Sequence, residues 1–159
     1  MPITLDDLTV DFAHLKREEI LTDWKWLIGK TKLPILLAAS GDAFVEDTND
    51  GSVQVLDVGA GKLTNVADSV EEFRSVLTDK QFVVDYFALE MIVDLRNSGK
   101  ALKKGQIYSL KKPLILGGEY ELENIEPTDV EIHFSTLGQI YEQASKLEPG
   151  TRITKVEIE

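Results

Sequence analysis

Apolar positions along the first half of the chain follow two different periods. Between residues 15 and 28 they recur at helical spacing and stop just before Gly29, so the pattern predicts a helix over this range. The following residues form short apolar runs separated by turn signals, of which Asn49-Asp50-Gly51 is the clearest. These runs predict strands at about 35–39, 43–47, 53–57 and 63–66. Apolar residues on both faces of the third run are typical of a strand covered on both sides.

The second half of the chain begins with helical patterns. Ser69 is the expected N-cap of one helix, and a second helix is expected over 80–97 with Asp79 as its cap. Residues 100–118 are expected to be irregular. Alternation predicts strands at 119–124, 129–134 and 152–159, with a helix over 136–147. Because the strands come in runs, we predict an α+β fold with a mainly antiparallel sheet packed with several helices, in a single domain over 1–159.

Composition narrows the class of protein. The chain has 159 residues, is 43% hydrophobic and 28% charged, and contains no cysteine, so disulfides, thiol catalysis and cysteine-bound zinc are excluded. The first residues are acidic and unlike a signal peptide, and the run LPILLAASG is too short to cross a bilayer. These features lead us to expect a cytoplasmic protein.

Motifs for chemistry are missing from the sequence. It contains no G-x-S-x-G elbow, no phosphate-binding glycine loop and no metal-ligand spacing, and its two histidines are His14 and His133. We therefore expect no catalytic residue, no metal and no cofactor, and a protein that is not an enzyme. A small-ligand pocket near Tyr108, Tyr120 and His133 is the alternative, and a single apolar cleft holding these polar groups would support it.

Charge is the strongest functional signal. Lysine and arginine number 17 against 28 acids, a formal charge of -11, which disfavours nucleic acid and anionic membranes and favours a basic protein partner. An acidic surface kept only for solubility accounts for the same number. Five lysines between 100 and 112 are followed by six acids without a base: Glu119, Glu121, Glu123, Glu126, Asp129 and Glu131. These acids form a candidate protein-binding ridge, or a solvated face partly neutralised by the lysines.

Trp26 is a further candidate for protein binding. It lies off the apolar stripe of the predicted helix over 15–28. An exposed tryptophan anchors many interfaces, whereas one that packs under a loop has a structural role. The sequence favours the second interpretation.

The stretch from Gly105 to Ile153 resembles the C-terminal domain of type VI secretion DNase-immunity proteins, a family long described as a domain of unknown function. The residues that carry the resemblance are Gly105-Gln106, Tyr108, Pro113, Leu116-Gly117-Gly118, Tyr120, Asn124, His133, Gly138-Gln139 and Pro149-Gly150-Thr151. Upstream, residues 41–77 are also similar, with a glycine-started hairpin and VADSVEEF opening a helix. The resemblance extends over about 35–159.

The resemblance implies an α+β binding protein, since the family is also reminiscent of SUKH-type immunity proteins. Some members neutralise a secreted bacterial nuclease, and others are stand-alone proteins. The longer members carry an additional N-terminal domain, whereas this chain has an N-terminal helical segment, 1–34, in that place. A toxin is therefore the expected partner, with a housekeeping interaction protein as the other interpretation.

Overall fold

The computed structural model describes residues 3–153 and 155–159, and its largest element is an antiparallel sheet in the order β1-β2-β3-β4-β5. The strands are β1 (Thr9–Val10), β2 (Lys32–Ala38), β3 (Ala43–Asp47), β4 (Val53–Asp57) and β5 (Lys62–Ala67). A second, two-stranded ribbon consists of β6 (Gln106–Leu110) and β7 (Ile125–Asp129). The predicted α+β class and the mainly antiparallel sheet are confirmed.

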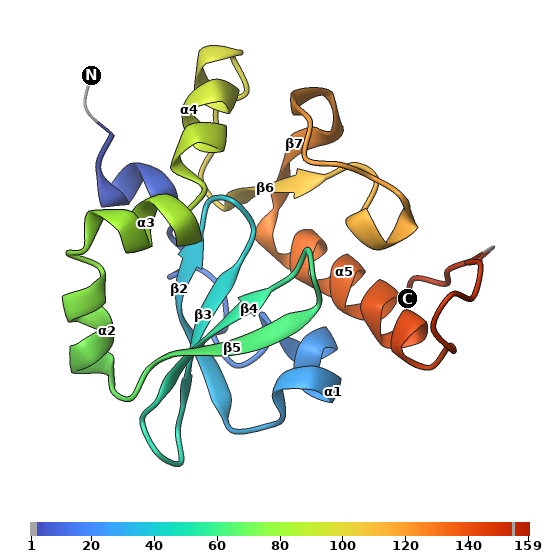
Figure 1. Ribbon diagram of the computed structural model, residues 1–159, viewed down its shortest axis with the longest axis horizontal. Coiled ribbons are helices and arrows are strands. Elements are labelled where there is room, and N and C mark those ends of the chain that lie inside the picture. Colours follow the sequence, from blue (N-terminus) through green and yellow to red (C-terminus); the bar gives the residue numbers. More distant parts are fainter. Residues whose placement is uncertain (1–2, 154) are drawn as a thin grey trace.

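Helices lie on both sides of the main sheet. They are α1 (Lys25–Ile28), α2 (Val70–Val76), α3 (Lys80–Tyr86), α4 (Leu89–Asn97) and α5 (Val130–Ser145). Figure 1 shows α2 and α3 on one flank of the sheet and α5, beside the β6–β7 ribbon, on the other. The predicted caps are confirmed, since Ser69 Oγ accepts the Glu72 N–H at 3.0 Å and the Asp79 carboxylate accepts the N–H of Gln81 at 2.9 Å.

The β3–β4 hairpin agrees with the sequence. Both strands have the predicted bounds, and Gly51 turns the chain with a φ of +76°. The first four residues of β4, 53–56, are buried, so this strand is covered on both faces as predicted. On one of these faces Phe44 lies at the centre of an aromatic cluster with Phe73, Phe82, Tyr86 and Phe87.

The ribbon is tied to the main sheet and to the N-terminal segment. The Tyr108 N–H of β6 donates to the carbonyl of Ala39, just beyond β2, at 2.9 Å. Trp24, fully buried, packs against Tyr141 of α5 with ring centroids 5.7 Å apart. The segment 3–34 therefore shares the core with the rest of the chain.

Two predicted helices differ from the structure. Residues 15–28 form turns, a 3₁₀ turn over Thr22–Trp24 and the short α1, because the segment wraps around the sheet edge, where Arg17 Nε donates to the carbonyl of Pro34 at 2.6 Å. The helix predicted over 80–97 is two helices, α3 and α4. Ala88 separates them in the left-handed conformation, with a φ of +49°. No glycine or proline marks that break in the sequence.

The predicted strands of the last third are wrong. Residues 119–124 form a bend and a 3₁₀ turn, while β6 and β7 lie at 106–110 and 125–129. Residues 130–134 form the start of α5. Val130 and Phe134, which belong to the alternating apolar pattern, are an i, i+4 pair of this helix. They lie on its buried face together with His133 and Leu137. Of the range 152–159, the structure describes all but residue 154 and assigns none of the described residues to a strand.

Candidate functional site

The connection between β6 and β7 is a loop closed on itself. Asn124 Oδ1 accepts the Lys112 N–H at 2.9 Å, and its Nδ2 donates to the carbonyls of Lys112 at 3.0 Å and Glu119 at 2.9 Å. A Cβ at Gly118 would lie 1.8 Å from the Lys112 carbonyl oxygen, so only glycine permits this approach. The Gly117-Gly118 pair therefore closes a loop, and Asn124 occupies backbone groups that a strand over 119–124 would need.

The six acids of the predicted ridge lie along this loop and the two elements that follow it. Glu119, Glu121 and Glu123 are on the loop, Glu126 and Asp129 on β7, and Glu131 on α5. All six are exposed. We call these six residues the acidic ridge. A hydrogen bond from the protonated Glu121 carboxyl to Glu119, together with the negative charge of Glu119, raises the pKa of Glu121, so like charges are crowded at this end of the ridge.

Ion pairing does not neutralise the acidic ridge. Across residues 3–153 and 155–159, the side-chain ion pairs within 4.0 Å involve other acids. Lys100, one of the five preceding lysines, donates instead to the loop carbonyls of Leu122 and Ile125. The exposed apolar side chains Ile115, Tyr120 and Leu122 stand beside the acids. This surface thus combines uncompensated charge with apolar contact area, as interfaces do.

Trp26 has a structural explanation. Its ring is half-buried and stacks on Trp24 with centroids 5.9 Å apart, and its Nε1 donates to the carbonyl of Gly138 at 3.2 Å. A Cβ at Gly138 would lie 2.5 Å from the Asp23 carbonyl oxygen, so α5 crosses the 3₁₀ turn at close range. The packing accounts for Trp26 without a partner.

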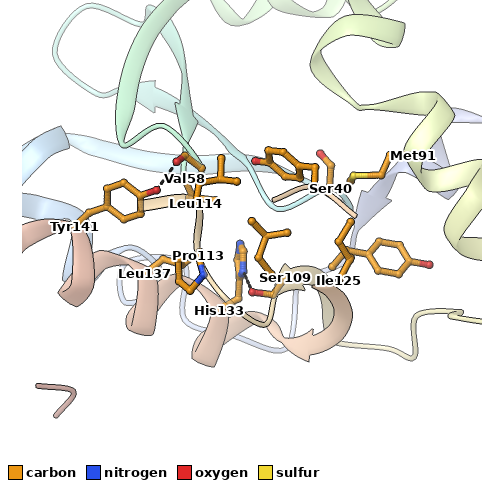
Figure 2. Close-up of a pocket in the computed structure, with 14 residues that line it drawn as sticks. Ser40, Val58, Met91, Ser109, Pro113, Leu114, Ile125, His133, Leu137 and Tyr141 are labelled. Carbon is orange, nitrogen blue, oxygen red and sulfur yellow. Dashed lines mark hydrogen bonds between the residues drawn. The ribbon is translucent and has the colours of Figure 1, made fainter. Parts of the chain in front are cut away.

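The three residues of the predicted pocket are brought together. Tyr108, Tyr120 and His133 line one cavity between the ribbon, α5 and the β4–β5 turn. The cavity has a volume of about 20 Å³, which is room for one water molecule. Figure 2 shows its walls filled by apolar side chains such as Leu114, Pro113 and Leu137. In this conformation the cavity has no space for a metabolite, and drug-sized ligands need several hundred Å³.

His133 holds three parts of the fold together inside this cavity. Its Nδ1 lies 2.7 Å from Ser109 Oγ, a contact drawn in Figure 2, and its Nε2 lies 2.8 Å from the carbonyl of Gly41. Because a carbonyl only accepts, Nε2 carries the proton and Nδ1 accepts from the serine hydroxyl. Burial lowers the pKa of His133 to about 4, so the ring is neutral near pH 7. The sequence predicted a strand over 129–134, whereas His133 lies on the buried face of α5.

Asp42 is a half-buried acid that the sequence did not single out. Burial of its carboxyl group, together with the charge of Asp57, raises its pKa to about 7. Its Oδ1 accepts the Val58 N–H at 3.2 Å. The pKa of Tyr120 is also raised, mainly by burial of its hydroxyl group and then by the negative charges of Asp42 and Asp57. Asp42 follows Gly41 at the β2–β3 turn, where its side chain is half-buried.

Shifted acids of this kind are found at many active sites, but this one has no room for a substrate. The Tyr120 hydroxyl oxygen would lie 2.2 Å from a Cβ at Gly59, and the Tyr141 hydroxyl donates to the Gly59 carbonyl. The hydroxyl groups of both tyrosines therefore lie close against Gly59. In the described part of the chain, no group of three or more His, Asp or Glu side chains is arranged to hold a metal ion. None of the helices described is long and apolar enough to cross a membrane.

The fold and the site define an α+β protein with one small cavity and an exposed acidic ridge. Residues 67–141 match the model of the family described as T6SS immunity protein Tdi1, C-terminal. The match confirms the resemblance seen in the sequence over that segment, which runs from the last residue of β5 into α5. The likeness over 35–66 and 142–159 stays a prediction. No curated protein matches the chain.

Proposed function

We propose that this protein is an immunity protein that binds and neutralises a secreted bacterial toxin with a basic surface. The family match supplies the biological role, and the acidic ridge supplies the recognition chemistry. The observation that carries the second part is that all six acids are exposed and that the ion pairs of the described residues involve other side chains. The negative electrostatic potential of these acids speeds the encounter with a cationic partner and disfavours partners with an acidic surface.

In this proposal the protein acts by binding, without catalysis, and the toxin is a nuclease met in the cytoplasm. A nuclease needs a basic surface to hold its own polyanionic substrate. An acidic protein seated on that surface competes with nucleic acid for the same charges. The cavity, with a volume of about 20 Å³, does not favour small-ligand binding as a second function.

The test begins with toxins encoded beside the gene. Co-expression with the cognate toxin should restore growth and yield a complex in which the two proteins co-purify. If no neighbouring toxin is neutralised or bound, the immunity role is refuted.

The acidic ridge is tested separately with Glu121→Lys, Glu123→Lys, Glu126→Lys and Glu131→Lys combined. The matched control reverses four exposed acids elsewhere: Glu71→Lys, Glu90→Lys, Asp94→Lys and Glu148→Lys. Both variants change the net charge equally, so a difference between them reports position. We expect the ridge variant to lose at least roughly tenfold in affinity, with a weaker salt dependence, and the control to lose much less. Equal losses would remove the ridge from the proposal.

A further inference from the structure

The C-terminal residues 155–159 lie against α5 and are held by two glutamine side chains. Gln143 Oε1 accepts the Glu157 N–H at 3.1 Å and its Nε2 donates to the Glu157 carbonyl at 2.5 Å. One turn earlier, Gln139 Oε1 accepts the Glu159 N–H at 2.6 Å and its Nε2 donates to the Glu159 carbonyl at 3.2 Å. Each amide thus satisfies both backbone groups of one residue, as a neighbouring strand would.

The spacing explains why this arrangement works. Four residues of an α-helix rise about 6 Å, and two residues of an extended chain span about 6.6 Å. Glutamines at positions i and i+4 of α5 therefore meet alternate residues of an extended segment that runs antiparallel to the helix. The pairing fixes the side chain between them, Ile158, on a defined side of the segment.

Ile158 forms one wall of a groove. The groove has a volume of about 430 Å³, and its other walls are the turns around Leu15 and Ile20 and the start of α5 at Ile132. Ile132 is 55% exposed and Ile158 is 49% exposed, although both are large apolar residues. Two exposed isoleucines facing one groove with a polar rim are typical of an interaction site.

The rim of the groove is acidic. Glu19, Asp23, Glu131 and Glu159 line it together with a single lysine, Lys16, which lies 4.0 Å from Glu19. Glu131 also belongs to the acidic ridge, so the groove continues that surface. An apolar centre with a negative rim is complementary to an apolar side chain flanked by basic residues.

We propose that this groove seats such an anchor, a leucine-like side chain between lysines or arginines on a protein partner. The identity of that partner as a toxin rests on the proposed function, whereas the binding chemistry of the groove does not. Gln139 and Gln143 act as positioning residues, because they hold the residues that complete the third wall.

The probe is an amidated, acetylated peptide, Lys-Arg-Leu-Arg-Lys, added to the full chain with labelled isoleucine methyl groups. We expect saturable shifts at the methyl groups of Ile132 and Ile158 and none at Ile92, which is fully buried and lies outside the groove. A peptide with serine in place of leucine, and one with glutamates in place of the basic residues, should each bind at least roughly tenfold more weakly. Equal binding by either peptide, or no shift at all, overturns the proposal.

Variants locate the site. Ile132→Ser should weaken the binding of the leucine peptide roughly tenfold. Leu147→Ser, at an exposed apolar residue outside the groove, should leave the affinity for this peptide unchanged. Gln139→Leu with Gln143→Leu should weaken binding and abolish the shift at Ile158 while that at Ile132 persists. If the glutamine variant binds like the wild type, the wall formed by residues 158–159 has no part in the site. These results do not depend on toxin neutralisation, so failure here and failure of the immunity role are distinguishable.

Discussion

Asp42→Asn is expected to stabilise the protein at alkaline pH. The carboxyl group of Asp42 has a pKa of about 7 in the folded protein and 3.8 in its reference state, because burial and the Asp57 charge disfavour the anion. An acid whose pKa is raised by folding binds its proton more tightly in the folded state. Stability is therefore lost as pH rises from 3.8 towards 7, and the loss is complete above 7.

The magnitude follows from the two pKa values. Each pH unit between them corresponds to ~1.4 kcal/mol, so the charged carboxylate costs the fold at most about 4 kcal/mol at pH 8 and about 2 kcal/mol at pH 5. Asparagine keeps an oxygen that accepts the Val58 N–H and carries no charge. Because two of these pH units lie between pH 5 and pH 7, the advantage of the variant should shrink by at most about 3 kcal/mol between pH 8 and pH 5.

Urea denaturation at both pH values, followed by the fluorescence of the buried Trp24, measures this difference. Asp94→Asn, at an exposed helical position, is the control and should show no such pH dependence. The reasoning is refuted if the difference in unfolding free energy between Asp42→Asn and wild type is the same at pH 5 and pH 8.

Three further outcomes are expected. The His133 ring should stay neutral down to about pH 4 in an NMR titration, and a ring that titrates near 6.5 contradicts this. As pH falls from 6.5 to 4, its burial should cost up to ~3 kcal/mol of stability, because the unfolded state takes up the proton first. Gly138→Ala should destabilise the protein by about 1–3 kcal/mol in chemical denaturation, because the alanine Cβ would meet the Asp23 carbonyl, and this outweighs the better helix propensity of alanine. A gain in stability would show that the backbone moves apart at this contact. Asn124→Ala should open the β6–β7 loop and speed amide hydrogen exchange at Lys112 at least roughly tenfold, and unchanged exchange would argue that Asn124 does not close the loop.

Local signals predicted the elements that depend on local chemistry. The β3–β4 hairpin follows from a turn that only Gly51 and its polar neighbours accommodate, and the starts of α2 and α3 follow from the capping side chains of Ser69 and Asp79. The break at Ala88 could not be predicted, since alanine favours helix and only tertiary packing holds it in the left-handed conformation. Five residues of alternating polarity at the start of α5 fit either period, and only the full helix length distinguishes them.

The candidate site was predicted in part for a similar reason. The order of charges along the chain was enough to name the six acids as a candidate site, and the structure adds that all six are exposed. The sequence also named Tyr108, Tyr120 and His133 together, and the structure places them around one cavity. It could not show that this cavity is filled, that Asp42 is half-buried against Val58 or that two glutamines hold residues 157 and 159, because those facts depend on contacts between distant segments.

The hydrogen bond from His133 to Gly41 joins residues 92 positions apart in the sequence and crosses the start of the family match at residue 67. Tyr141 makes a second crossing to Gly59, and Tyr108 a third to Ala39. The matched segment is therefore not a cooperative unit of unfolding: cut out at its borders, it would lose the carbonyls that these three residues use.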